Sequence, residues 1–154
     1  MKRFAFQLES VRELRELEEK DARGHYGMAC KTRDTAQEAC RTAELRVETA
    51  RLEWGSRVTA GIDGNSLRQW QVGWAVLQTQ RDHLLHELRM AEGRLQAARQ
   101  KWQAARQRLE GLDRLKSQRW TEHHAEANRL EVQLLDEIAS ARAANDARAF
   151  LFNL

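Results

Sequence analysis

Apolar residues recur in the longer, later part of the chain at alternating intervals of three and four, the spacing of a coiled-coil helix face. The row is clearest over residues 67–112, where thirteen of fourteen positions are apolar. Its members are Leu67, Trp70, Trp74, Leu77, Leu84, Leu88, Ala91, Leu95, Ala98, Trp102, Ala105, Leu109 and Leu112. The exception is Arg81, and the row shifts at Lys116 before it resumes at Trp120. The pattern predicts a helix over about residues 66–149 that packs along a second helix.

A weaker row of apolar positions occupies the first part of the chain. Its members are mostly small: Phe4, Leu8, Val11, Ala22, Tyr26, Ala29, Ala36, Cys40, Val47, Ala50, Trp54 and Val58. Three glycines follow Trp54 within a short window, the one place where both rows stop. The sequence therefore predicts a helix over about residues 3–60 and a glycine-rich turn at about residues 61–65. Asn65 or Ser66 is expected to cap the second helix.

The two rows fit together if the chain folds back at this turn, so that facing residues have numbers that sum to about 124. Small residues then lie opposite large ones, as Ala50 lies opposite Trp74, and this alternation favours close packing. We therefore expect an all-α fold, a single domain over residues 1–154 that forms a long antiparallel two-helix coiled-coil hairpin. The second helix is expected to be the longer of the two.

The longer helix should extend beyond its partner. In this register the first helix ends at Phe4, opposite Trp120. About residues 121–149 of the second helix therefore have no partner helix. That segment still carries apolar residues: Leu130, Leu134 and Ile138, followed by Phe150, Leu151 and Phe152. An unpaired apolar row on a monomer usually marks a surface for a partner.

Composition narrows the class of protein. The 154 residues include no proline, and 32% are charged, with a mean hydropathy of -0.76; this is typical of long helices and excludes all-β and βαβ folds. The 26 basic and 23 acidic residues are interleaved, whereas a nucleic-acid-binding protein more often shows a block or face of one sign. One stretch is locally basic, so contact with phosphate groups is not excluded there: Arg94, Arg99, Arg106 and Arg108. The overall balance nevertheless predicts no nucleic-acid partner.

The compartment follows from the apolar runs and the cysteines. No run of about 18 apolar residues could cross a membrane, and charges follow Met1 at once, where a signal peptide would need an apolar core. Cys30 and Cys40 would lie about 15 Å apart on one helix, which is too far for a disulfide. We therefore expect a reduced, cytoplasmic protein.

The sequence offers no motif for catalysis. It contains no phosphate-binding glycine loop, no nucleophile elbow and no paired-cysteine motif. A two-helix hairpin also has little interior in which catalytic groups could converge. The pairs His83 with His86 and His123 with His124 are too few for a metal site of three or four ligands. We expect a protein that is not an enzyme and that holds no cofactor and no metal.

Five tryptophans are many for such a chain. Trp70, Trp74 and Trp102 lie on the apolar row, so the simplest interpretation is that they form the core. Two helices cannot fully bury an indole, however. Trp70 and Trp74, near the turn, are therefore also candidate anchors for a partner.

Three segments carry a resemblance to a known family. An aromatic-x-aromatic-x-Leu motif begins at Phe4 and leads into a Leu- and Glu-rich stretch. Trp70 and Trp74 stand ahead of Leu77, just after the glycine-containing turn. Residues 129–139 read Arg-Leu-Glu-Val-Gln-Leu-Leu-Asp-Glu-Ile-Ala, similar to an Arg-x-Glu-x-x-x-Leu-Asp-Glu-x-Ala signature. In this order the segments resemble the FliJ family of flagellar type III export proteins, whose injectisome counterpart is YscO.

The resemblance implies a small, cytoplasmic, non-enzymatic coiled coil similar to the central stalk of a rotary ATPase. The implied partners are the hexameric export ATPase, whose assembly and activity the family promotes from within the pore, and the cytoplasmic domain of the export gate. Some members also bind export chaperones. Such a protein reaches the cytoplasmic face of the inner membrane only through these partners. The expected partner-binding residues are Arg129, Leu130, Leu134, Asp136 and Glu137 with Phe4 at the ATPase, and Trp70 and Trp74 at the gate.

Other classes stay open from the sequence. A plain structural coiled coil, such as a spacer or cargo adaptor, would form a stable dimer, whereas a stalk would be a monomeric hairpin. A nucleic-acid-binding hairpin would show an affinity that falls steeply with salt. Within the resemblance, an injectisome counterpart is the alternative to a flagellar protein, although the Leu-Asp-Glu signature favours the flagellar system.

Overall fold

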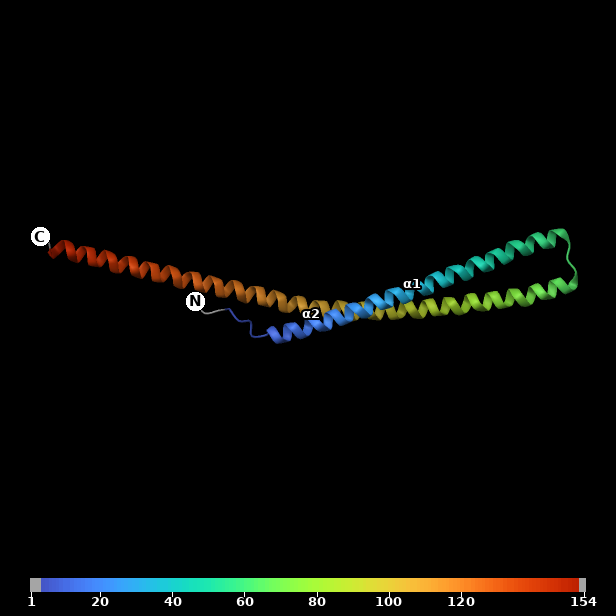
Figure 1. Cartoon of the computed structure of the whole chain (residues 1–154), viewed down its shortest axis with the longest axis horizontal. Helices are drawn as coiled ribbons and strands as arrows, with labels where there is room; N and C mark the ends of the chain where they lie inside the picture. The colour runs from blue at the N-terminus through green and yellow to red at the C-terminus, as the bar shows by residue number, and fades with distance from the viewer. Residues whose placement is uncertain (1–3, 153–154) are drawn as a thin grey trace. The chain divides into compact units, whose positions relative to one another are not determined.

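The computed structural model describes residues 4–152, with side chains up to Asp146 and at Arg148. This part of the chain forms two helices and no strand: α1 spans Glu9–Ala60 and α2 spans Gly64–Phe152. A short connection joins them, and the chain reverses direction there, as the green segment of Figure 1 shows. The fold is an all-α helical hairpin whose second helix is the longer, as predicted. None of its described helices is long and apolar enough to cross a membrane.

The turn between the helices begins with a glycine in the left-handed conformation. Gly61 has φ +93°, the one positive φ among the described residues, and its N–H donates to the carbonyl of Val58 at 3.2 Å. A residue with a Cβ is strained at this angle, whereas glycine adopts it freely. Gly61 therefore ends α1 at the position where the glycine-rich window predicted a break.

The cap of α2 is Asp63. Its Oδ1 accepts the backbone N–H of Ser66 at 2.9 Å, and its carbonyl accepts the N–H of Leu67 at 3.1 Å. Hydrogen bonds from the side chain and backbone of Ser66 lower the pKa of Asp63. The prediction that Asn65 or Ser66 caps the helix is wrong, because the carboxylate upstream reaches the free N–H groups first. The helix consequently begins at Gly64, two residues earlier than predicted.

The described chain divides into two compact units. Unit 2, Leu17–Arg106, contains the turn and an antiparallel part of each helix. Its buried side chains are all small: Cys40, Ala43, Ala91 and Ala105. The predicted row of α2 is half-buried or buried at every position from Trp70 to Ala105, including Arg81, whereas Leu67 is exposed. The alternating spacing therefore located the contact face of this helix.

Aromatic contacts confirm the predicted register in unit 2. The ring centroids of Trp54 and Trp70, whose numbers sum to 124, lie 4.4 Å apart. Trp102 stacks on Tyr26 at 5.1 Å and donates its indole N–H to Glu19 at 2.7 Å. These two partners of Trp102 lie on either side of Ala22, the position that the register places opposite it.

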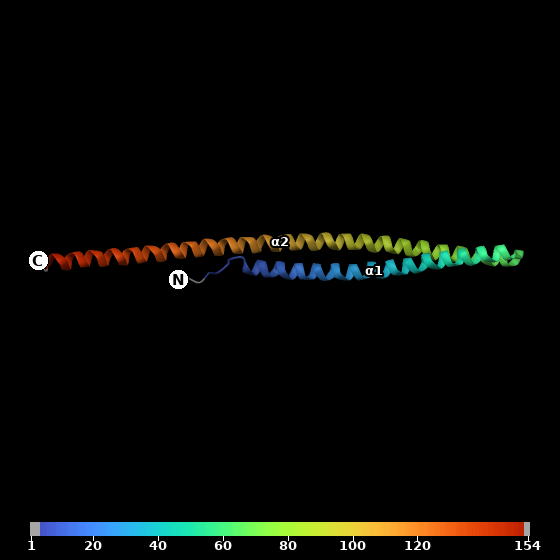
Figure 2. The same ribbon diagram turned by 90° about the horizontal axis from the view of Figure 1, so that it is seen from above.

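Unit 1 consists of Met1–Glu16 and Gln107–Leu154, of which residues 4–16 and 107–152 are described. Figures 1 and 2 show the start of α1 lying beside α2 in this unit. The prediction that Leu8 and Val11 face inward is wrong, because both are exposed. The contact row of α1 instead reaches Arg12, one position further along, whose side chain is 23% exposed. Charged residues therefore join apolar ones in the contact between the helices here.

The chain ahead of α1 is not helical, although the sequence predicted a helix from about residue 3. Residues 4–6 are extended and a turn leads into Glu9, whose N–H donates to the carbonyl of Phe6 at 3.1 Å. An extended chain covers about 3.3 Å per residue and a helix about 1.5 Å. The segment therefore reaches further along α2 than a helix would. His123 and Ala127 are half-buried, so the fully exposed part of α2 begins near residue 128 rather than at 121.

Candidate partner-binding surfaces

The tail of α2, residues 128–146, is exposed at every position. Leu130, Leu134 and Ile138 are 56%, 59% and 49% exposed. Since successive helix residues turn by about 100°, these three side chains fall within one quarter of the helix surface. Val132 and Leu135 are also exposed and lie on other sides of the same helix. Apolar side chains thus occur around much of the tail, and none of those named here is covered by α1.

Two strips of charge accompany the apolar row of the tail. Glu137 is seven residues from Leu130 and falls beside the apolar row. Arg129 and Asp136, also seven residues apart, share a neighbouring strip. All three are exposed, and they form no ion pair with any side chain that the structure describes. The structure therefore gathers the predicted ATPase-facing residues, apart from Phe4, on one stretch of helix. The predicted apolar ending, Phe150–Phe152, lies outside the described side chains.

Phe4 lies at the end of unit 1's paired region that adjoins the tail. Its ring meets that of His123 edge-on at a centroid distance of 5.6 Å. Phe4, Phe6 and Leu8 line a groove together with Leu115 and neighbouring residues of α2. Phe4 therefore serves to hold the extended segment against α2. Trp120, predicted to lie opposite Phe4, lines one groove with it, is 53% exposed and packs its ring against His124.

A cluster of charges joins the start of α1 to α2. Arg12 donates to Asp113 at 2.6 Å and lies 3.3 Å from Glu9 and 3.5 Å from Glu16. Lys116 pairs with Glu9 at 2.7 Å. The hydrogen bond from Lys116 lowers the pKa of Glu9, and the bond to Asp113 raises that of Arg12. The sequence did not predict this cluster, although Lys116 occupies the position where the apolar row of α2 shifts.

Three indoles stack near the turn in unit 2. Trp54, Trp70 and Trp74 lie with centroid distances of 4.4 and 5.2 Å and interplanar angles of 17° and 19°. All three are half-buried. A groove runs past Trp70 and Trp74 and along Ala50 and Leu77. The cluster therefore serves both as packing and as accessible aromatic surface. Trp54 was not predicted as part of it, although the register of 124 places it opposite Trp70.

The possible metal ligands do not gather in the described part of the chain, and one of its two cysteines is buried. Among the described residues, no group of three or more histidine, cysteine or acidic side chains is placed to hold a metal ion. Cys40 is buried, and its burial raises the pKa of its thiol, which disfavours the reactive thiolate. Cys40 therefore acts as a small packing residue between the helices.

The described residues thus define a class of fold, an all-α helical hairpin with an exposed apolar extension. Comparison with known families identifies the family. Residues 4–148 match the family described as Flagellar FliJ protein, which is nearly the whole chain. The chain belongs to the FliJ family and so is a component of the flagellar protein-export apparatus. The role of this family in export is non-catalytic. No curated protein and no solved structure matches it.

Proposed function

We propose that this chain acts as a stalk that binds within the pore of the hexameric export ATPase, promotes the assembly and activity of the ring, and links it to the export gate. The observation that carries the proposal is the bare tail of α2, where Leu130, Leu134 and Ile138 stay exposed. Burial of an apolar side chain stabilises a complex by roughly 1.5–3 kcal/mol. An uncovered row of this kind is therefore best explained by a partner.

The distribution of apolar residues around the tail supports an enclosing partner. Val132 and Leu135 lie on other sides of the helix than Leu130 and Leu134. A flat partner surface would cover only one side of such a helix, whereas the lumen of a ring surrounds it. The exposed charges of Arg129, Asp136 and Glu137 supply orientation through pairing with basic and acidic groups of the ring.

The stalk acts on the ring through its asymmetry. A single helix in a six-fold ring cannot contact all six subunits alike, so it favours one subunit interface over the others. A ligand that binds two states of an interface unequally shifts their populations and couples successive sites. The contact therefore biases which ATP site closes without adding a catalytic group.

The aromatic cluster is the proposed contact with the cytoplasmic domain of the export gate. Trp70 and Trp74 are half-buried, next to a groove, and tryptophan is the side chain most enriched among interface anchors. Export chaperones are further proposed partners, as the family resemblance implies. Through these contacts the protein would work at the cytoplasmic face of the inner membrane.

Charge reversal on the tail tests the ATPase contact. The double variant Asp136→Lys with Glu137→Lys should bind the export ATPase about tenfold or more weakly, because close charge pairs at interfaces are worth about 1.5 kcal/mol or more. The measurement is titration of the labelled chain with the ATPase at fixed salt. The matched control is Glu87→Lys with Glu92→Lys, two exposed acidic residues of α2 in unit 2. Equal affinity of both double variants and the native chain would count against the tail as the contact.

The alternative function is that of a structural coiled-coil spacer or adaptor. Such a protein would also expose apolar residues, but it would use them to dimerise. Sedimentation equilibrium of the isolated chain separates the two, since the stalk is expected to be a monomer. A stable dimer that is lost on Leu130→Ser with Leu134→Ser would favour the spacer.

A further inference from the structure

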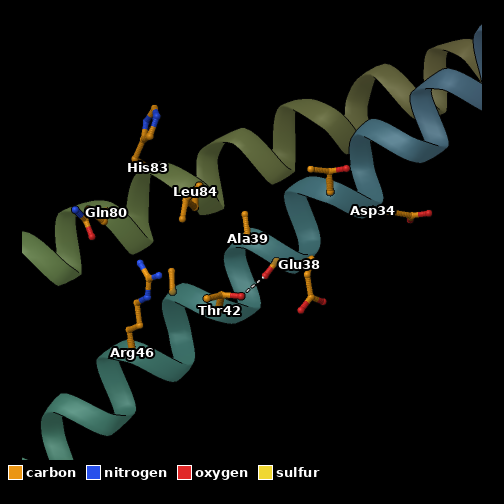
Figure 3. A pocket seen from close by; sticks show the side chains of 10 residues that line it. Asp34, Glu38, Ala39, Thr42, Arg46, Gln80, His83 and Leu84 are labelled. Carbon is orange, nitrogen blue, oxygen red and sulfur yellow. Dashed lines mark hydrogen bonds between the residues drawn. The ribbon is translucent and has the colours of Figure 1, made fainter.

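A groove in unit 2 is used by neither proposed contact. It runs between α1 and α2 midway along the unit and encloses about 880 Å³ (Figure 3). Its floor consists of apolar side chains, among them the buried Ala43 and the half-buried Ala39 and Leu84. A groove between two packed helices is the place where a third helix fits in a bundle.

Two threonines lie among the charged residues on the α1 wall of the groove. Thr35 and Thr42 line it, and each hydroxyl donates to the carbonyl four residues earlier, at 3.0 Å in both cases. Figure 3 shows this bond from Thr42 to the carbonyl of Glu38. Because the hydroxyl hydrogen is used within the helix, the γ-methyl group is left for a docking chain to meet. The two threonines therefore add to the apolar character of the groove.

The two ends of the groove carry opposite charge. Glu38 and Asp34 lie toward one end, and Arg46 lies at the other. Asp34 is compensated by Arg33 at 2.9 Å. Glu38 and Arg46 form no side-chain ion pair with any described residue. They are eight residues apart, which corresponds to about 12 Å along a helix. The groove thus presents one uncompensated acid and one uncompensated base on either side of an apolar floor.

We propose that this groove receives an amphipathic α-helix of a partner protein, which lies along unit 2 as a third helix. The occupant has an apolar row at helical spacing, an acidic residue that meets Arg46 and a basic residue that meets Glu38. Small side chains at Ala39 and Thr42 let its backbone come close, and helix-in-groove docking is a common mode of peptide recognition. The charges at the two ends set its direction.

The test uses a synthetic helical peptide as the probe. The peptide has about 18 residues, a leucine and alanine row at three- and four-residue spacing, and one glutamate and one lysine about eight positions apart. It is labelled with a fluorophore and titrated with the full chain, and anisotropy reports binding. Thr42→Arg should weaken binding about tenfold or more, because a long charged side chain then fills the groove.

The matched control for that substitution is Thr59→Arg. Thr59 is also exposed, and its hydroxyl also donates to the carbonyl four residues earlier, at 2.8 Å from Gly55, but it lies outside the groove. The control should bind the peptide as the native chain does. Far-ultraviolet circular dichroism confirms that both variants keep their helices. Equal loss in both variants, or loss in neither, overturns the proposal.

A charge exchange tests the direction of the helix. The double variant Glu38→Lys with Arg46→Glu should bind the original peptide several-fold more weakly, and a peptide with its own two charges exchanged should recover the native affinity. Absence of this recovery, or absence of any peptide binding to the native chain, contradicts the proposal. Sedimentation equilibrium of the chain alone shows whether a second copy of the chain occupies the groove. A dimer that Thr42→Arg abolishes assigns the groove to a second copy and overturns the partner helix.

Discussion

Single residues set where each helix begins and ends. Gly61 ends α1 because it alone among the described residues takes a positive φ, and Asp63 begins α2 by accepting the N–H of Ser66. The sequence predicted the break itself, because three glycines gather there. It did not predict which residue caps the helix, because Asp63, Asn65 and Ser66 all have side chains that can accept this hydrogen bond. The choice depends on the path of the turn, which no local pattern specifies.

The cap can be tested by removing its carboxylate. Asp63→Ala leaves the first N–H groups of α2 without their acceptor, so the melting temperature should fall by roughly 2–4 °C. Thermal unfolding followed by circular dichroism measures the change. The control is Asn65→Ala, which removes the residue that was wrongly predicted as the cap and should leave the melting temperature nearly unchanged. A larger fall in the control than in Asp63→Ala would restore the sequence-based prediction.

The charge cluster at the start of α1 predicts a dependence on pH. The pKa of Glu9 is lowered from its ordinary value of 4.5, chiefly by the hydrogen bond from Lys116. A lowered pKa means that the contribution to stability is fully present above pH about 4.5 and is lost as the pH falls through the folded-state pKa. Acidification below pH 4.5 should therefore lower the amide protection factors of residues 9–16, the ratio of intrinsic to observed exchange rates, before those of residues 30–50.

The variant Glu9→Gln isolates this contribution. It should exchange faster than the native chain in residues 9–16 at pH 6, and the difference should narrow as the pH falls. Both partners are partly exposed, so the effect is modest and is screened by salt. A native chain whose protection factors in this segment do not change as the pH falls would contradict the assignment.

At the scale of the element, helix periodicity was the most informative part of the sequence. The row from Trp70 to Leu112 lies against α1 because its three- and four-residue spacing keeps one helix face inward. The same logic failed ahead of Glu9, where Phe4 and Phe6 alternate with a period of two and form an extended segment instead. Periodicity also placed Val11 wrongly on the contact face. The residue that faces α2 there is the charged Arg12, which a pattern of apolar residues does not identify.

Small residues in the contact row determine how close the two helices lie. Ala91 is 4% exposed. Ala91→Leu should therefore lower the free energy of unfolding by about 1–3 kcal/mol, because the added atoms force the helices apart. Urea unfolding measures the change. The control Ala97→Leu alters an exposed position of the same helix and should change stability by less than about 0.5 kcal/mol. Similar losses in both variants would refute the close approach at Ala91.

At the scale of the whole molecule, the fold class and the family could be predicted from the sequence, since both depend on periodic patterns and ordered motifs. The extent of the free tail could not, because it depends on how far the extended segment at Phe4 reaches along α2. That segment shortens the uncovered part of α2, among the residues whose side chains are described, to residues 128–146, or roughly 28 Å of helix at about 1.5 Å per residue. The proposed ATPase contact lies entirely within this stretch.

The central claim is that the uncovered tail of α2 activates the export ATPase. The most direct test is the rate of ATP hydrolysis by the export ATPase below the concentration at which it assembles by itself, with and without the chain. The account predicts marked stimulation by the full chain and by the control Val72→Ser, whose residue is exposed in unit 2. Stimulation should be lost in a chain truncated after Ala127 and in Leu130→Ser with Leu134→Ser. A rate unchanged by the full chain, or stimulation that survives the truncation, would contradict the account.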